Sequence, residues 1–303
     1  MPLSLQVENI EKSYIKVKAL DDITFSVNQG ELFGIIGPDG AGKTTLFRIL
    51  TTLLKPDKGF AKVNGFDVVK DYKQIRKIVG YMPGKFSLYQ DLSVIENLEF
   101  YARIFGTTIA ENYHLIKDIY TQIEPFKNRL AGQLSGGMKQ KLALSCALIH
   151  KPEVLFLDEP TTGVDAVSRK EFWEMLIRLK NMGICILVST PYMDEAELCD
   201  KVVLMQNGKI LANNTPNNIR KTFGKKLYNV KSENLYMLLK DIKAFDANLS
   251  VYPFGEYLHV ADKNNNFEKE NVIEYLNKKG YNEIEIYETK AGIEDCFMDL
   301  MKK

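Results

Sequence analysis

The segment Gly-Pro-Asp-Gly-Ala-Gly-Lys-Thr-Thr at residues 37–45 has the residue types and spacing of a loop that binds phosphate. Glycines let successive backbone N–H groups turn inward around an anion, and a helix that starts at the loop adds its partial positive charge. We predict that Lys43 contacts the β- and γ-phosphates of a nucleotide and that the Thr44 hydroxyl ligates Mg²⁺. The predicted binding residues of this loop are Gly37, Pro38, Asp39, Gly40, Ala41, Gly42, Lys43, Thr44 and Thr45.

A second chemical motif is the carboxylate pair Asp158 and Glu159, which follows the apolar run at residues 154–157. Side chains at the carboxyl ends of buried parallel strands are presented to a ligand. We therefore predict that Asp158 holds the Mg²⁺ shell and that Glu159 is the catalytic residue that polarises an attacking water. The same pair could instead cap the helix that follows it.

Both motifs lie beside predicted buried strands, as expected for an α/β domain. Leu32–Ile36 is a continuous apolar run directly before the phosphate loop. Apolar residues at helical spacing over residues 46–54 predict the helix that follows the loop. Residues 184–189 form another apolar strand, followed by a turn and a predicted helix.

Composition limits the classes of protein to which the chain can belong. It has 303 residues with 40 Lys and Arg against 39 Asp and Glu, so a large nucleic-acid surface is not suggested and no nucleic-acid partner is expected. No stretch approaches the roughly 20 apolar residues of a membrane span, and we expect a soluble, cytoplasmic chain. The cysteines lack the spacing of a zinc site or a disulfide framework and are expected to be buried. They are Cys146, Cys185, Cys199 and Cys296.

Between the two chemical motifs, the sequence Leu-Ser-Gly-Gly-Met at residues 134–138 precedes a helix predicted over residues 138–150. Ser135 and the two glycines after it offer a hydroxyl and free N–H groups around a point that no side chain blocks. That arrangement is typical of an anion-binding helix start. Taken alone, it could also be a flexible surface turn.

In this order and at this spacing, the motifs resemble those of ATP-binding-cassette (ABC) ATPases over about residues 3–222, including the Gly-Val-Asp loop at residues 163–165. The resemblance implies a P-loop NTPase cassette of α/β class at residues 1–222. A helical subdomain is implied at about residues 85–150, where Ser93-Val-Ile-Glu96 is a capping box. The implied cofactors are ATP and Mg²⁺, bound where two cassettes pair head to tail.

The same resemblance assigns residues to the interface between two cassettes. Ser135, Gly136 and Gly137 are implied to contact nucleotide that is held by the partner cassette. Asp165 is implied to lie across the dimer interface. Tyr14 matches the aromatic residue that stacks on adenine, and the alternative for an aromatic near a strand is a core position.

Two positions depart from the family pattern. Gly84 stands where the family has a glutamine after the strand, and Gln90 is interpreted as a surface turn residue. Pro191 stands where the family has a catalytic histidine after a strand. Because both missing groups act chiefly on the γ-phosphate and the attacking water, we expect Mg-ATP to bind well and to be hydrolysed slowly. The two departures resemble the degenerate cassette of exporters whose ATPase halves are unequal.

The resemblance implies the ATP-binding subunit of an ABC exporter, working with a second cassette and an ABC-2-type membrane permease. We expect it to be peripheral on the inner face of the cell membrane. Two alternatives remain open: a soluble ABC protein without a transport role, and a regulatory subunit that only binds ATP. Residues 85–89 include three large apolar side chains near the expected groove for a membrane partner, and ordinary core packing explains them as well.

After about residue 222 the sequence pattern changes. Residues 223–303 are predicted to form a small α+β domain with the element order β-α-β-β-α-β, the ferredoxin-like arrangement. A last helix is predicted over residues 291–300, resembling the tail of drug-export cassettes. The default expectation for this extension is packing against the cassette.

Overall fold

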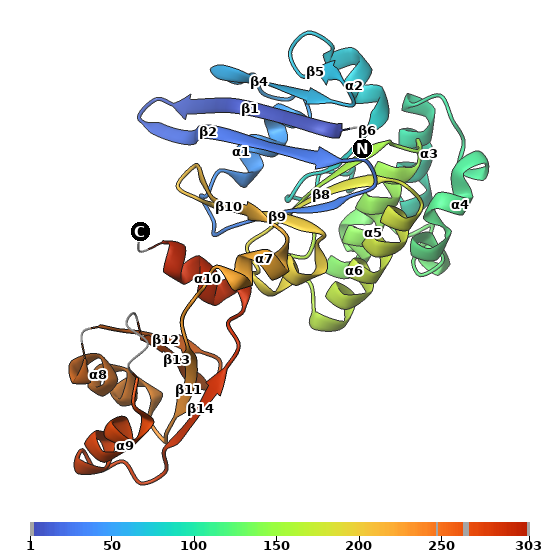
Figure 1. Cartoon of the computed structure of the whole chain (residues 1–303). Helices are drawn as coiled ribbons and strands as arrows, with labels where there is room; N and C mark the ends of the chain where they lie inside the picture. The colour runs from blue at the N-terminus through green and yellow to red at the C-terminus, as the bar shows by residue number, and fades with distance from the viewer. Residues whose placement is uncertain (1–2, 247, 263–266, 302–303) are drawn as a thin grey trace. The chain divides into compact units, whose positions relative to one another are not determined.

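The computed structural model describes residues 3–246, 248–262 and 267–301 (Figure 1). The chain divides into two compact units, Met1–Pro216 and Asn217–Lys303. The division comes before the residue 222 expected from the sequence, because residues just after Pro216 pack within the second unit. There the carbonyl of Ile219 accepts a hydrogen bond from Cys296 Sγ at 3.5 Å. In the described ranges, no helix is both long enough and apolar enough to cross a membrane.

The first unit contains a six-stranded sheet of order β10-β9-β3-β8-β7-β6. Five neighbouring strands run parallel, and only β10 is antiparallel to its neighbour. β3, β7 and β8 are buried along their whole length, which explains their continuous apolar sequences. The strands are β3 (Leu32–Ile36), β6 (Val79–Met82), β7 (Val154–Asp158), β8 (Cys185–Thr190), β9 (Lys201–Gln206) and β10 (Lys209–Asn214).

A four-stranded antiparallel sheet of order β2-β1-β4-β5 shares a hydrophobic core with the larger sheet. Phe25 stacks on Phe33 with ring centroids 5.3 Å apart, and Phe47 meets Phe156 edge to face at 5.7 Å. These contacts join both sheets to the helix that follows the phosphate loop. The elements are β1 (Leu3–Tyr14), β2 (Val17–Asn28), β4 (Lys58–Val63), β5 (Phe66–Asp67), α1 (Lys43–Leu50) and α2 (Tyr72–Ile78).

A helical segment lies between β6 and β7 in the sequence, and Figure 1 shows α3, α4 and α5 gathered at one end of the large sheet. The capping box predicted at Ser93 and Glu96 is confirmed, since each side chain bonds the backbone N–H of the other residue. After β7, α6 (Ala166–Asn181) packs on the sheet. The elements of the segment are α3 (Val94–Ile104), α4 (Ile109–Tyr120), α5 (Gly136–Leu148) and the 3₁₀ helices η1 (Glu124–Phe126) and η2 (Ala131–Gln133).

The sequence misplaces one end of each of two helices and the type of a third. α1 ends at Leu50, not at residue 54, because Thr52 turns to a φ of +65°, and Leu53 is 57% exposed. α5 begins at Gly136 rather than Met138. The helix expected after β8 is the short 3₁₀ helix η3 (Asp194–Leu198).

The large apolar side chains at residues 85–89 differ in burial. Leu88 is buried, whereas Tyr89 is 52% exposed and packs edge to face on Phe100 at 4.8 Å between ring centroids. Core packing therefore accounts for Leu88, and Tyr89 stays partly accessible on the surface of the unit.

The second unit contains an antiparallel sheet of order β12-β13-β11-β14 with two helices inserted in the order β-α-β-β-α-β. The element order predicted from the sequence is therefore observed. α8 and α9 bury Leu238, Ile242, Val272 and Leu276 in a separate core. The elements are α7 (Pro216–Lys221), β11 (Leu227–Lys231), α8 (Leu235–Phe245), β12 (Leu249–Phe254), β13 (Tyr257–Asp262), α9 (Lys269–Lys278), β14 (Glu285–Thr289) and α10 (Ile293–Leu300).

A buried polar cluster fixes α10 to this sheet. Asp295 Oδ1 accepts a hydrogen bond from Tyr252 Oη at 2.7 Å and lies 2.5 Å from His259 Nδ1. Burial by itself raises the pKa of Asp295, but hydrogen bonds from His259, Tyr252 and the Gly292 N–H outweigh it and leave that pKa below its usual value. The carboxylate form of Asp295 is therefore stabilised in the folded unit.

We predict that Asp295→Asn lowers the free energy of unfolding of the second unit by about 1.5–3 kcal/mol at pH 7, the usual range for a hydrogen bond to a charged group. The measurement is urea unfolding followed by circular dichroism. Because folding lowers the pKa of Asp295, its stabilisation is present above the usual aspartate value of 3.8 and is lost as pH falls through the lower folded value. The difference between wild type and variant should therefore shrink below pH 3.8. Glu270→Gln, at an exposed position of α9, is the control and should change stability little.

Candidate nucleotide-binding site

The phosphate loop predicted from the sequence lies between the end of β3 and the start of α1. Gly40 and Gly42 adopt φ values of +79° and +104°, a region that favours glycine. A Cβ on Gly37 would lie 2.2 Å from the carbonyl oxygen of Met205, and a Cβ on Gly42 would lie 2.5 Å from that of Ala19. The shape of this loop therefore depends on glycine at specific positions.

The amino end of α1 opens onto a cavity of about 370 Å³. Its N-cap residue Gly42 supplies no side-chain cap, so the helix presents its first N–H groups and its positive dipole end to this space. Tyr14 is 42% exposed and lines the same cavity. The lining residues are Tyr14, Val17, Lys18, Ala19, Gly40, Ala41, Gly42, Lys43, Thr44, Thr45, Glu159 and Asn207.

Lys43 connects the loop to the acidic strand. Its side chain is only 3% exposed, and Nζ donates hydrogen bonds to the carbonyl oxygens of Gly37 at 2.7 Å and Pro38 at 3.1 Å. Nζ also lies 3.1 Å from Glu159 Oε1. A buried ammonium group requires such partners, and a phosphate entering the cavity would supply a further one.

The acidic pair is held at the carboxyl end of β7 by a residue of the neighbouring strand. Ser189 on β8 donates a hydrogen bond from Oγ to Asp158 Oδ1 at 2.6 Å. The Glu159 N–H lies 3.0 Å from both the carbonyl oxygen and Oγ of Ser189. Glu159 adopts a φ of +51°, a strained conformation for this residue type. That turn takes Glu159 out of the strand direction and towards Lys43.

Ser189 is a site residue that the sequence prediction missed. It is fully buried and stands before Thr190 at the carboxyl end of β8, after four apolar residues. A hydroxyl at the carboxyl end of a parallel strand next to the acidic strand was the available signal, since buried polar groups require a partner.

The predicted signature and the loop at residues 163–165 form a second group of residues away from this cavity. Ser135 caps α5 by accepting a hydrogen bond from the Met138 N–H at 3.4 Å. Asp165 caps α6 by accepting bonds from the N–H groups of Val167 and Ser168, and the bonds from Ser168 lower the pKa of Asp165. None of Ser135, Gly136, Gly137 and Asp165 lines the phosphate cavity.

The two helix starts of this second group pack against one another. A Cβ on Gly136 would lie 3.5 Å from the carbonyl oxygen of Gly163, and one on Gly137 would lie 3.2 Å from Ser168 Oγ. Ser135 and Gly136 are exposed. One chain therefore carries the phosphate cavity and, apart from it, an exposed helix start that does not line that cavity.

The two departures from the family pattern lie near the acidic pair. Gly84 is exposed, and a Cβ placed on it would lie 3.0 Å from the carbonyl oxygen of Asp158. Pro191 directly follows the last residue of β8. Gln90 is an exposed turn residue whose carbonyl accepts a bond from the Gly132 N–H, as the sequence suggested.

The histidines lie outside the phosphate cavity. His114 is on α4 and His259 belongs to the second unit. His150 stacks on Phe105 with ring centroids 3.8 Å apart, and burial lowers the pKa of His150. No described histidine therefore substitutes for the side chain missing at Pro191.

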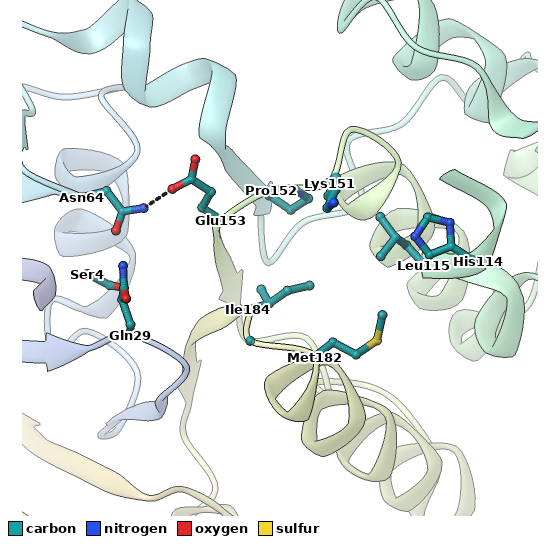
Figure 2. Close-up of a pocket in the computed structure, with 11 residues that line it drawn as sticks. Ser4, Gln29, Asn64, His114, Leu115, Lys151, Pro152, Glu153, Met182 and Ile184 are labelled. Atoms are coloured by element: carbon teal, nitrogen blue, oxygen red, sulfur yellow. Dashed lines mark hydrogen bonds between the residues drawn. The ribbon is translucent and has the colours of Figure 1, made fainter. Parts of the chain in front are cut away.

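A second hollow, with a volume of about 480 Å³, opens near the starts of β7 and β8, at the opposite ends of these strands from the acidic pair (Figure 2). Asn64 Nδ2 donates a hydrogen bond to Glu153 Oε2 at 2.6 Å on its wall. It is lined by neither glycine-loop nor acidic-pair residues. Ligands of parallel sheets bind at the carboxyl ends of the strands, so a hollow at the amino ends is not part of the nucleotide site.

For Mg²⁺, the chain offers the Thr44 hydroxyl and the Asp158 carboxylate. Across residues 3–246, 248–262 and 267–301, no group of three His, Cys, Asp or Glu side chains could hold a metal ion. Mg²⁺ in nucleotide sites needs only one or two protein oxygens, because waters and substrate phosphates complete its shell. Thr44 at the cavity wall and the buried Asp158 fit that donor set.

A glycine loop that cradles phosphate before a helix, with a carboxylate pair at the end of a neighbouring parallel strand, defines a P-loop nucleotide-binding domain. Comparison with known proteins narrows this class. The family model for ABC transporters matches residues 20–162. A solved ATP-binding subunit of an ABC transporter aligns with a TM-score of 0.67 at 31% identity, covering 73% of this chain and 93% of that one.

Curated relatives agree with that comparison. The chain is 40% identical over 288 residues to the ABC transporter ATP-binding protein YbhF of Escherichia coli, covering 93% of this chain and 49% of YbhF. It is 34% identical over 252 residues to the doxorubicin resistance ATP-binding protein DrrA of Mycobacterium tuberculosis, covering 82% of this chain and 75% of DrrA. The chain thus spans about half the length of YbhF. It belongs to the family of ABC transporter ATP-binding proteins.

We predict that Gly42→Ala weakens Mg-ATP binding at least tenfold, because its Cβ would lie 2.5 Å from the backbone oxygen of Ala19 and the φ of +104° is unsuited to alanine. Gly40→Ala is the matched control: its φ is also positive, but nothing lies within 4 Å of the added Cβ. It should cost about 1 kcal/mol of local strain and weaken binding much less. Titration with a fluorescent ATP analogue measures both, and equal losses would contradict the steric explanation.

Proposed function

We propose that this chain is the ATP-binding subunit of an ABC exporter, which binds Mg-ATP and uses its hydrolysis to drive a membrane permease. The observation that carries this proposal is the cavity at the amino end of α1, in which Lys43 and Glu159 meet 3.1 Å apart. A binding lysine and a hydrolytic carboxylate at one cavity suit a nucleoside triphosphatase better than a passive binding module.

The residues of the cavity and Asp158, which precedes Glu159 in the chain, have different chemical roles. Lys43 and the N–H groups of the loop hold phosphate, and Thr44 and Asp158 provide oxygens for Mg²⁺. Mg²⁺ supplies charge neutralisation at the phosphates when bound. Once Lys43 contacts phosphate, its pairing with Glu159 weakens and that carboxylate can accept a hydrogen bond from water. Tyr14 provides a ring surface for the base.

The working unit in this proposal is a pair of cassettes. Ser135, Gly136 and Gly137 are exposed or half-buried and lie outside the phosphate cavity of their own chain. The backbone N–H groups at this helix start can bind an anion that another chain holds. We place it against nucleotide on a second cassette, with Asp165 at the interface. The second cassette is either another copy or a related chain.

Drug export is supported by the names of relatives. DrrA is a doxorubicin resistance protein, and a Bacillus subtilis relative with 34% identity over 224 residues is a linearmycin resistance protein. On this basis the partner is an ABC-2-type permease, and the chain sits on the inner face of the cell membrane through that permease. The second unit is a ferredoxin-like extension of the cassette.

We further propose that hydrolysis at this chain's own phosphate loop is slow. Gly84 offers no side-chain amide to the Mg²⁺ shell or the water, and Pro191 offers no imidazole to the γ-phosphate. If each missing group is equivalent to one electrostatic donor, the barrier rises by about 3 kcal/mol for each, or roughly 10²- to 10³-fold in rate. Ground-state binding depends on other residues, namely the loop and Lys43. The chain would then bind ATP and complete the active site of a more competent partner.

We predict that Glu159→Gln lowers the steady-state ATPase rate of the purified chain by less than about tenfold, because a slow site has little catalysis left to lose. Lys43→Ala, which removes a phosphate contact, is the comparison and should abolish ATP binding measured by titration. A loss of several hundredfold from Glu159→Gln alone would refute slow hydrolysis while leaving ATPase function intact.

We predict that Pro191→His together with Gly84→Gln raises the ATPase rate at least a hundredfold if the deficit is chemical. Pro191→Ala and Gly84→Ala are the controls, since they change the backbone or add a Cβ without adding a polar group. The Cβ at Gly84 must fit 3.0 Å from the Asp158 carbonyl oxygen, so Pro191→His alone is the cleaner arm. An unchanged rate in the double variant would instead assign the deficit to the missing signature of a partner.

The exporter and its two alternatives predict different experimental results. Isolation of the complex from membranes with a permease subunit supports the exporter, whereas co-purification with ribosomes or DNA supports an ABC protein without a transport role. ATP affinity with no turnover, even beside the partner, identifies a regulatory subunit.

A further inference from the structure

A buried carboxylate, Glu195, is bonded to the turn that carries Glu159 but does not line the phosphate cavity. It belongs to η3, the 3₁₀ helix after β8, and is only 2% exposed. Glu195 Oε2 accepts a hydrogen bond at 3.1 Å from the hydroxyl of Thr161, which is 1% exposed. Because Thr161 follows Glu159 by two residues, this bond joins the segment after β8 to the turn after β7.

The turn after β7 has a backbone conformation that needs support. The φ of +51° at Glu159 is strained for this residue type and persists only where surrounding contacts hold it. Ser189 accepts a bond from the Glu159 N–H at the start of the turn, and the Thr162 N–H bonds the Glu159 carbonyl oxygen at 3.2 Å. The bond from Thr161 to Glu195 adds a buried side-chain anchor within the same turn.

The second oxygen of Glu195 lies near a cation on α6. Oε1 accepts no hydrogen bond from the residues that the structure describes, and it is 3.9 Å from Arg169 Nε. Arg169 Cζ lies 5.1 Å from the centroid of the Tyr192 ring, and the Arg169 N–H bonds the carbonyl oxygen of Asp165 at 2.9 Å. Glu195 is therefore adjacent both to the turn after β7 and to the first turns of α6.

Burial of a carboxylate is unfavourable unless its contacts compensate. Loss of hydration destabilises an ionised carboxylate, and a well-packed apolar residue of similar volume is often at least as stable in such a position. One oxygen of Glu195 has a single hydrogen bond, and the other has only the distant guanidinium group. Core packing alone does not explain an acid at this position, so its role lies in the residues that it contacts.

We propose that Glu195 is a positioning residue for ATP hydrolysis, which holds the turn of Glu159 through the hydroxyl of Thr161. It acts on the nucleotide only through Glu159. Pro191 leaves the segment after β8 without an imidazole, and the buried bond gives that segment another way to contribute to the site. The inference rests on the hydrolytic role proposed above for Glu159.

The test compares Thr161→Val with wild type in the full purified chain. Valine is similar in shape to threonine but has no hydroxyl, so the turn loses its bond to Glu195. Thr162→Val, at the exposed neighbouring position, is the matched control, and Thr161→Ser, which keeps a hydroxyl, is the rescue variant. Thermal unfolding checks that each variant is folded. Glu195→Met, which removes the acceptor, is the second variant if Thr161→Val does not fold.

Hydrogen exchange followed by mass spectrometry measures whether the turn is held, and it needs no turnover of ATP. We expect the amides of Glu159, Thr161 and Thr162 to exchange at least about threefold faster in Thr161→Val than in wild type, because local opening exposes them. Exchange in Thr162→Val and Thr161→Ser should stay within about twofold of wild type. Unchanged exchange in Thr161→Val would overturn the proposal.

Steady-state ATPase kinetics measure whether that support matters for the chemistry. Thr161→Val should lower kcat at least about twofold, and by no more than Glu159→Gln does, while KM for ATP stays within about twofold because the phosphate loop is intact. Thr161→Ser should restore kcat. In a chain that already carries Glu159→Gln, Thr161→Val should lower kcat no further, since both changes act through one carboxylate.

The kinetic results distinguish failure of this proposal from failure of the proposed function. A loss from Thr161→Val that persists in full beside Glu159→Gln would overturn the positioning role alone. Faster exchange with unchanged kcat would also overturn it, because the bond would then be only structural. An unchanged rate in Glu159→Gln by itself would refute the hydrolytic role of Glu159, and the positioning role with it.

Discussion

The buried ammonium group of Lys43 is the interaction on which the nucleotide site depends. It joins two carbonyl oxygens of its own loop to the carboxylate at the end of β7. A buried charge is tolerated only with such partners. These contacts therefore fix the glycine loop beside the acidic strand before any ligand binds. The left-handed turn at Glu159 directs its carboxylate to Lys43, and Ser189 holds that turn by accepting a hydrogen bond from the Glu159 N–H while it donates one to Asp158.

The sequence predicts those parts of the site whose residues lie close together along the chain. The loop at residues 37–45 and the pair after β7 are recognisable because their spacing is set by neighbouring residues on one strand and one helix. Ser189 was missed because its role is created by the pairing of β7 with β8, with Asp158 opposite Ser189 in the register. The early end of α1 was missed for a similar reason: apolar side chains continue to Leu54, but the backbone turns at Thr52.

The residues of the second group, which do not line the phosphate cavity, are packed together at the starts of two helices. The starts of α5 and α6 pack through Gly136, Gly137 and Ser168, and each helix is capped by the side chain just before it. Capping satisfies N–H groups that would otherwise require water or ligand. These contacts and caps place residues 135–137 close to the segment that Asp165 caps within a single chain.

The close approach of Gly84 to the Asp158 carbonyl also limits which residues position 84 accepts. A Cβ there would lie 3.0 Å from that carbonyl oxygen, so a larger residue fits only after the backbone of the acidic strand or of the loop after β6 has shifted. Position 84 and the acidic strand therefore cannot be altered independently, because a change of residue at the first displaces the backbone that carries Asp158 and Glu159.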